Sequence, residues 1–110
     1  MAKLEDVLQG NIYEWLAKIQ HGILHSNTSA SLEDSSDFIC GDTKCCVRVF
    51  ERYSLLGGNR LSLNLTLLQI GDGPIHLSAI TAGGSCGVIV KINTWGEKNF
   101  LNDLRDMLYQ

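Results

Sequence analysis

The chain has 110 residues, 45% of them hydrophobic and 19% charged, with a formal net charge of −3 at pH 7. This length suits one domain with its own core, and the negative charge disfavours nucleic acid or an anionic membrane as a partner, because both bind basic surfaces. No stretch reaches the ~18 apolar residues of a membrane helix, and acidic residues follow Met1 where a signal peptide would be apolar. We therefore expect a cytoplasmic protein.

The first residues fit either a strand or a helix. Leu4, Val7 and Leu8 would share one side of a helix, whereas Leu4 and Leu8 on either side of Asp6 suit a short strand. Both alternatives stay open for residues 3–9.

A helix is predicted directly after this segment. Asn11 is a favourable N-cap, and Glu14 is its capping-box partner. Gly22 fits the end of the helix. The apolar stripe of this helix consists of Ile12, Leu16, Ile19 and Ile23.

Apolar and polar residues alternate from Cys46 to Thr81, most regularly from Leu61 to Leu67. A period of two indicates strands with one buried face. Glycine-rich junctions divide this part of the chain. We predict strands at 28–40, 45–55, 60–69, 74–82 and 87–93.

A second helix closes the chain. Thr94 and Glu97 form a capping box, and an apolar stripe follows it. The order strand–helix–four or five strands–helix predicts a single α+β domain over residues 1–110, with two helices on one face of an antiparallel sheet of five to six strands. In topology this two-layer fold resembles the TATA-binding-protein-like and helix-grip architectures, which implies no function. The stripe residues are Phe100, Leu101, Leu104, Met107 and Leu108.

Loop lengths predict how neighbouring strands pair. A four-residue turn at 41–44 places Phe38 opposite Val47, and the next loop places Val47 opposite Leu67. These residues would share the apolar face, and Phe50 would lie on the polar face.

Two arginines would lie on the polar face. Arg48 would pair with Asp37, and Arg52 with Glu33, across neighbouring strands. Such pairs are usual on a solvated sheet face, so they have a purely structural explanation. Binding of an anionic ligand is the alternative role for the same arginines.

The following strands would add hydroxyl and imidazole groups to this face. Ser78 is expected beside Thr66, and His76 opposite Leu68. Together these side chains form a shallow polar surface that could hold an anionic or polar ligand. The candidate ligand-binding residues are Arg48, Arg52, Asn64, Thr66, His76 and Ser78.

Asp34 and Glu51 break the alternation. They would face each other on the apolar side, where two carboxylates repel and one would keep its proton through a raised pKa. These candidate buried acids could form an acid–base pair. The alternative is a bulge near Ser35 and Ser36, or a position at the margin of the sheet.

No motif predicts a cofactor, a metal site or a catalytic residue. The four cysteines lack the paired Cys-x-x-Cys spacing of zinc sites. His21 and His25 have the spacing of helical metal ligands, but no third ligand accompanies them.

A family resemblance extends over most of the chain. Its segments are Ala30–Phe38, Val47–Tyr53 and Leu77–Ser85, which resemble the sequences of small uncharacterised proteins from Firmicute bacteria. The resemblance implies a bacterial, cytosolic origin and favours a strand at residues 3–9. It implies no activity.

Two functional hypotheses follow. The first is a non-catalytic binding or assembly module that uses the polar sheet face or a strand edge, with a homodimer through that edge as one outcome. The alternative is a small enzyme or small-molecule carrier with a cavity between the sheet and the helices. That cavity would contain Asp34 and Glu51, with Trp15, Tyr53 and Trp95 as its walls.

Overall fold

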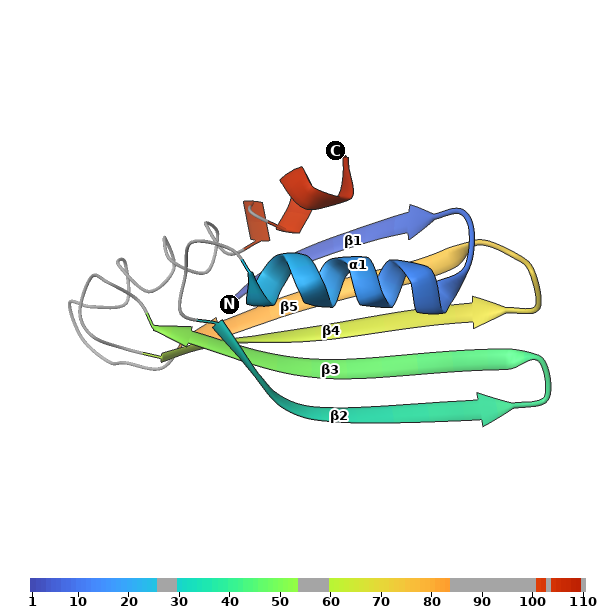
Figure 1. The fold of residues 1–110 in the computed structure, drawn as a ribbon, viewed down its shortest axis with the longest axis horizontal. Coiled ribbons are helices and arrows are strands. Elements are labelled where there is room, and N and C mark those ends of the chain that lie inside the picture. The colour runs from blue at the N-terminus through green and yellow to red at the C-terminus, as the bar shows by residue number, and fades with distance from the viewer. Residues whose placement is uncertain (26–29, 54–59, 84–100, 103, 110) are drawn as a thin grey trace.

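The computed structural model describes residues 1–25, 30–53, 60–83, 101–102 and 104–109. These residues form one helix, five strands and a second helical segment at 101–102 and 104–108, which confirms the α+β class (Figure 1). The elements are β1 (Ala2–Leu8), α1 (Ile12–Leu24), β2 (Ala30–Cys40), β3 (Thr43–Tyr53), β4 (Arg60–Ile70) and β5 (Ile75–Gly83).

The five strands form an antiparallel sheet in the order β1-β5-β4-β3-β2. Residues 3–9, for which strand and helix were both open, lie mainly in β1, which pairs with β5 from Ala2 opposite Thr81 to Leu8 opposite Ile75. The strand predicted at 87–93, the capping box of Thr94 and Glu97, and Phe100 lie outside the described residues.

Helix α1 begins where the sequence predicts. The side chain of Asn11 accepts hydrogen bonds from the backbone N–H groups of Tyr13 and Glu14, at 2.9 and 3.1 Å. The predicted stripe of Ile12, Leu16, Ile19 and Ile23 is buried.

The prediction that Gly22 ends this helix is wrong, because α1 continues to Leu24. A Cβ atom at Gly22 would overlap the side chain of Met107. The glycine therefore serves the close approach of the C-terminal helical segment to α1.

The core lies between one face of the sheet and the two helical segments. β4 supplies its centre, because every second residue of this strand is buried. Leu101, Leu104 and Leu108 of the predicted closing helix are buried in the same core. The central β4 residues are Leu61, Leu63, Leu65 and Leu67, each at most 1% exposed.

The predicted register holds between β4 and β5 and is wrong between β3 and β4. Leu68 lies opposite His76 as expected, but Val47 lies opposite Thr66 instead of Leu67. Phe50, expected on the polar face, is completely buried opposite Leu63. The shift of one residue turns every side chain of β3 to the other face of the sheet.

The turn between β2 and β3 contains two residues, not the predicted four. Cys40 pairs with Thr43, and Gly41 adopts a φ of +60°, which glycine reaches without a steric penalty. Phe38 therefore lies opposite Cys45 instead of Val47. A bulge between Leu32 and Asp34 then shifts the register once more.

Gln69 connects the sheet to the start of α1. It is 3% exposed, and its side-chain oxygen accepts a hydrogen bond from the backbone N–H of Ile12 at 3.3 Å. Its amide nitrogen donates to the carbonyl groups of Gly10 and Gly73, at 2.8 and 2.9 Å. One side chain thus satisfies three backbone groups of two loops and a helix N-terminus.

We expect Gln69→Leu to lower the free energy of unfolding by about 2–4 kcal/mol, because it leaves these backbone groups unsatisfied in the protein interior. Urea denaturation followed by circular dichroism would measure the change. Gln20→Leu, on the partly exposed side of α1, is the control and should change stability by less than about 0.5 kcal/mol. An equally small change for Gln69→Leu would contradict the structural role.

We expect Gly22→Leu to destabilise the protein by about 1–3 kcal/mol, because its side chain would displace the side chain of Met107 from its place against α1. Thermal unfolding would measure this, and Met107→Ala in the same chain should restore part of the loss. Ala17→Leu, on the exposed side of α1, is the matched control. Equal losses of stability in Gly22→Leu and Ala17→Leu would show that the contact between Gly22 and Met107 does not require a glycine.

Candidate functional site

The open face is the side of the sheet opposite the two described helical segments. It is defined by every second residue of each strand, and no helix that the structure describes covers it (Figure 1). The strand register arranges its central side chains in three rows that cross the sheet from β1 to β2.

The first row contains Lys3, Ile80, Asn64, Val49 and Asp34. The second row contains Glu5, Ser78, Thr66, Val47 and Ser36. The third row contains Val7, His76, Leu68, Cys45 and Phe38.

A shallow hollow of ≈ 550 Å³ lies on the open face where β1, β5 and β4 meet. One carboxylate, two hydroxyl groups and one imidazole line it together with two apolar side chains, a mixture typical of a binding surface. The side chains on this face that line the hollow are Glu5, Val7, Thr66, Leu68, His76 and Ser78.

Four of the six candidate ligand-binding residues come together on the open face. Ser78 lies opposite Thr66, and His76 is the next residue of β5 on the same face. The hydroxyl of Thr66 donates to the side-chain oxygen of Asn64 at 3.4 Å. Asn64 lies next to the hollow and does not line it.

The two arginines do not join these residues. Arg48 lies opposite Leu65, and Arg52 lies opposite Leu61, so both face the helices instead of the open face. The predicted placement is wrong because the register of β3 differs by one residue. Arg52 is buried and lies opposite Ala30 on the other side, so Glu33 is not its cross-strand neighbour.

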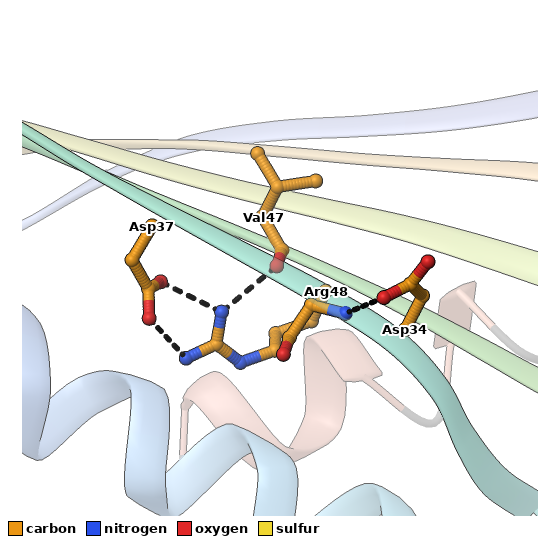
Figure 2. Close-up of polar contacts among 5 residues, drawn as sticks. Asp34, Asp37, Val47 and Arg48 are labelled. Carbon is orange, nitrogen blue, oxygen red and sulfur yellow. Dashed lines mark hydrogen bonds and ion pairs between the residues drawn. The ribbon is translucent and has the colours of Figure 1, made fainter.

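The pair of Arg48 with Asp37 does form, on the face opposite to the predicted one. Figure 2 shows the guanidinium between the carboxylate of Asp37 and the carbonyl of Val47. Its nitrogens donate to the two carboxylate oxygens at 2.7 and 3.2 Å and to that carbonyl at 2.8 Å. The Arg48 side chain is 11% exposed and that of Asp37 is 54% exposed, so the pair lies at the margin of the core.

This ion pair determines the electrostatics around Cys46. Hydrogen bonding to Arg48 holds the pKa of Asp37 below its ordinary value. Burial, together with the nearby negative charge of Asp37, raises the pKa of the Cys46 thiol to about 11. The thiol is therefore protonated at neutral pH and behaves as an apolar core residue.

The structure also corrects the predicted pairing of Asp34 with Glu51. Asp34 lies opposite Val49 and is exposed, whereas Glu51 lies opposite Ser31. The carboxylate of Glu51 forms an ion pair with Arg60 at 3.2 Å. The predicted alternative of a bulge is close to the observed one, which falls between Leu32 and Asp34.

Several open-face residues were not predicted as part of a site. Val47 and Val49 replace the two arginines there, and Leu68 lies between His76 and Cys45. Their signal in the sequence is weak, because β3 has apolar residues at both odd and even positions. Val7 joins the site only through the pairing of β1 with β5.

His21 of α1 and His25, the C-cap of this helix, lie on the other side of the sheet. The rings of His21 and His25 stack with centroids 4.1 Å apart, beside a hollow of ≈ 390 Å³ along α1. Among the described residues no group of three potential metal ligands gathers at one point. None of the described helices has the length and apolar character needed to cross a membrane.

A family model described as "Family of unknown function (DUF6054)" matches residues 1–110. The chain belongs to the DUF6054 family. No curated protein matches the chain significantly. In this DUF6054 member, the arrangement of the open face is therefore the main evidence on function.

We expect Asp37→Asn to lower stability by about 1 kcal/mol at pH 7, a value limited by the solvent around the carboxylate. The pKa of Asp37 is lower in the folded state than its ordinary value of 3.8. The ion pair therefore contributes its full stabilisation above pH 3.8, and this stabilisation is lost as the pH falls through the folded-state pKa. The difference between wild type and variant should thus shrink as the pH falls below about 4. Urea denaturation across this range would measure it.

Asp106→Asn is the control, because it removes an exposed carboxylate of the C-terminal helical segment that does not pair with Arg48. A difference between wild type and Asp37→Asn that stayed constant down to pH 2 would contradict the role of the ion pair.

Proposed function

We propose that the protein is a non-catalytic binding or assembly module that acts through the open face of its sheet. The observation that carries the proposal is the exposure of large apolar side chains on this face, among hydroxyl groups. Val7 is 52% exposed, Phe38 58%, Ile70 58% and Ile80 39%. A surface that exposes several large apolar side chains is typical of a site for another molecule.

The open face supports binding better than the strand edges do. Among the described strands, β1 and β2 lie at the two ends of the sheet. β2 contains a bulge and the acidic residues Glu33, Asp34 and Asp37, which are features that keep an edge from pairing with another strand. We therefore favour the face over the edge as the surface of assembly.

The polar groups in the hollow favour binding over catalysis. His76, Ser78 and Glu5 are residue types found in hydrolytic sites, yet no hydrogen bond joins any two of them in the described part of the chain. Glu5 instead pairs with Lys3 at 3.1 Å. Without a base in contact with the hydroxyl, Ser78 has no activation as a nucleophile.

The alternative of an enzyme or carrier requires a cavity between sheet and helices. The described residues fill that space with apolar side chains, and the hollows named above open on the surface of the sheet or of α1. Asp34 is exposed and Glu51 has Arg60 as its partner, so neither carboxylate marks an internal site. These observations favour the first hypothesis.

The proposed setting is the bacterial cytoplasm, with neither nucleic acid nor membrane as partner. Cys40, Cys45 and Cys46 are free thiols, which suits a reducing compartment. The net charge of −3 favours a protein or small-molecule partner over nucleic acid. We also propose that the fold has a helix-grip-like or TATA-binding-protein-like topology, a comparison that implies no function.

Native mass spectrometry of the gently purified full chain would test the proposal. We expect a non-covalent complex that is lost in Thr66→Arg, because the arginine would stand at the centre of the open face. Ile39→Arg is the matched control, since Ile39 is exposed on the other side of the sheet. Equal loss or equal retention in the two variants would show that the open face is not the binding surface.

A further inference from the structure

We propose that a second copy of this chain occupies the open face. This inference rests on the binding role that we propose for that face. The two sheets would pack as an aligned β-sandwich, with a two-fold axis that runs parallel to β4 between them. The three rows of side chains and the charges at their ends support this arrangement.

β4 is the central strand, with two strands on each side of it. A two-fold axis along β4 therefore pairs each row with the same row of the second copy in reverse order, so that the β1 end of one copy faces the β2 end of the other. Leu68 then meets Leu68 of the partner subunit at the axis, and Asn64 meets Asn64 of the partner subunit. The two amides can hydrogen-bond each other, since each has donors and an acceptor.

The ends of the rows are complementary in this arrangement. Lys3 at the β1 end of the first row meets Asp34 of the partner subunit at the β2 end, and symmetry forms this pair twice. In the same row Ile80 meets Val49 of the partner subunit. In the third row Val7 meets Phe38 of the partner subunit, so two of the most exposed apolar side chains cover each other.

A two-fold axis perpendicular to the strands and through the second row is disfavoured by charge. An axis perpendicular to the strands would lay the second row on itself without turning it, so Glu5 would face Glu5 of the partner subunit. It would also bring Val7 onto Lys3 of the partner subunit. Two like charges at a desolvated contact are costly, whereas the parallel axis has no such contact.

The size of the open face fits a stable dimer. The five strands are spaced by about 4.8 Å, and seven to eleven residues per strand at about 3.3 Å each give a length of roughly 23–36 Å. The resulting area of roughly 550–850 Å² per copy includes the ~800 Å² that each partner contributes to a standard interface.

The angle between the sheets shifts these contacts by a few ångströms. Aligned sheets pack about 30° apart, so the axis bisects the angle between the two β4 strands, and only the contact at the crossing point, near Thr66, stays unchanged. The edge strands shift by roughly 5 Å and the Leu68 and Asn64 pairs by roughly 3 Å. The flexible stem of Lys3 spans this displacement. Its present partner Glu5 is an exposed neighbour on the same strand, so the ion pair can be exchanged.

Sedimentation equilibrium of the full chain, from micromolar to millimolar concentration, would test the dimer. We expect a dimer for wild type and for Ile39→Arg, and a monomer for Leu68→Arg, because two arginines would meet at the axis. Circular dichroism would confirm that each variant is folded. A wild-type monomer at all concentrations would overturn the proposal.

The charges at the ends of the first row test the orientation. Lys3→Glu and Asp34→Lys should each weaken dimerisation by about tenfold, because each replaces two attractive contacts by repulsive ones. The double variant should return to within about threefold of wild type. A dimer in which the double variant stays weak, or in which neither charge matters, would overturn the proposed arrangement.

The failure of this inference is distinguishable from the failure of the proposed function. If the chain is a monomer but another molecule binds it and is lost in Thr66→Arg, the open face is a binding surface for a different partner. If no complex responds to Thr66→Arg, the binding role of the face fails as well.

Discussion

The row of leucines in β4 is the contact on which the rest of the structure depends. These side chains are buried against the stripe of α1 and the leucines of the C-terminal helical segment. Each contributes about 1.5–3 kcal/mol by leaving water, so no other orientation of β4 competes. Once β4 is oriented, the antiparallel ladders determine which face every other strand presents to the helices.

β3 shows how strongly this constraint acts. Its register to β4 turns Cys46 and Phe50 into the core and also turns two arginines toward the helices. Arg48 is accommodated there because Asp37 and the carbonyl of Val47 satisfy its guanidinium at the margin of the core. The chain accepts a nearly buried charge in exchange for the burial of Phe50, which is the larger gain.

The composition of the open face follows from the same register. With Arg48 and Arg52 turned away, the centre of this face is formed by valine, leucine and isoleucine beside two hydroxyl groups and an imidazole. A face of arginines would select an anion by charge. The observed mixture is better suited to a surface that is itself partly apolar, such as a second copy of the same sheet.

Local sequence patterns predict a large part of the fold. Helix α1, its Asn11 cap, the α+β class and the faces of β4 and β5 follow from periodicity and capping, because each of these signals acts within a few residues. Four of the six candidate ligand-binding residues share the open face for the same reason, since β4 alternates strictly from Leu61 to Leu67 and its register to β5 follows from the loop length.

Only the tertiary structure decided how β3 and β2 are oriented. β3 is apolar at Cys46 and Phe50 as well as at Val47 and Val49, so its pattern permits both faces, and the choice depends on packing against α1 and β4. The two-residue turn at Gly41 and the bulge after Leu32 then place β2. The sequence by itself thus determined the layers and the central strand, whereas contacts between distant segments decided which residues form the open face.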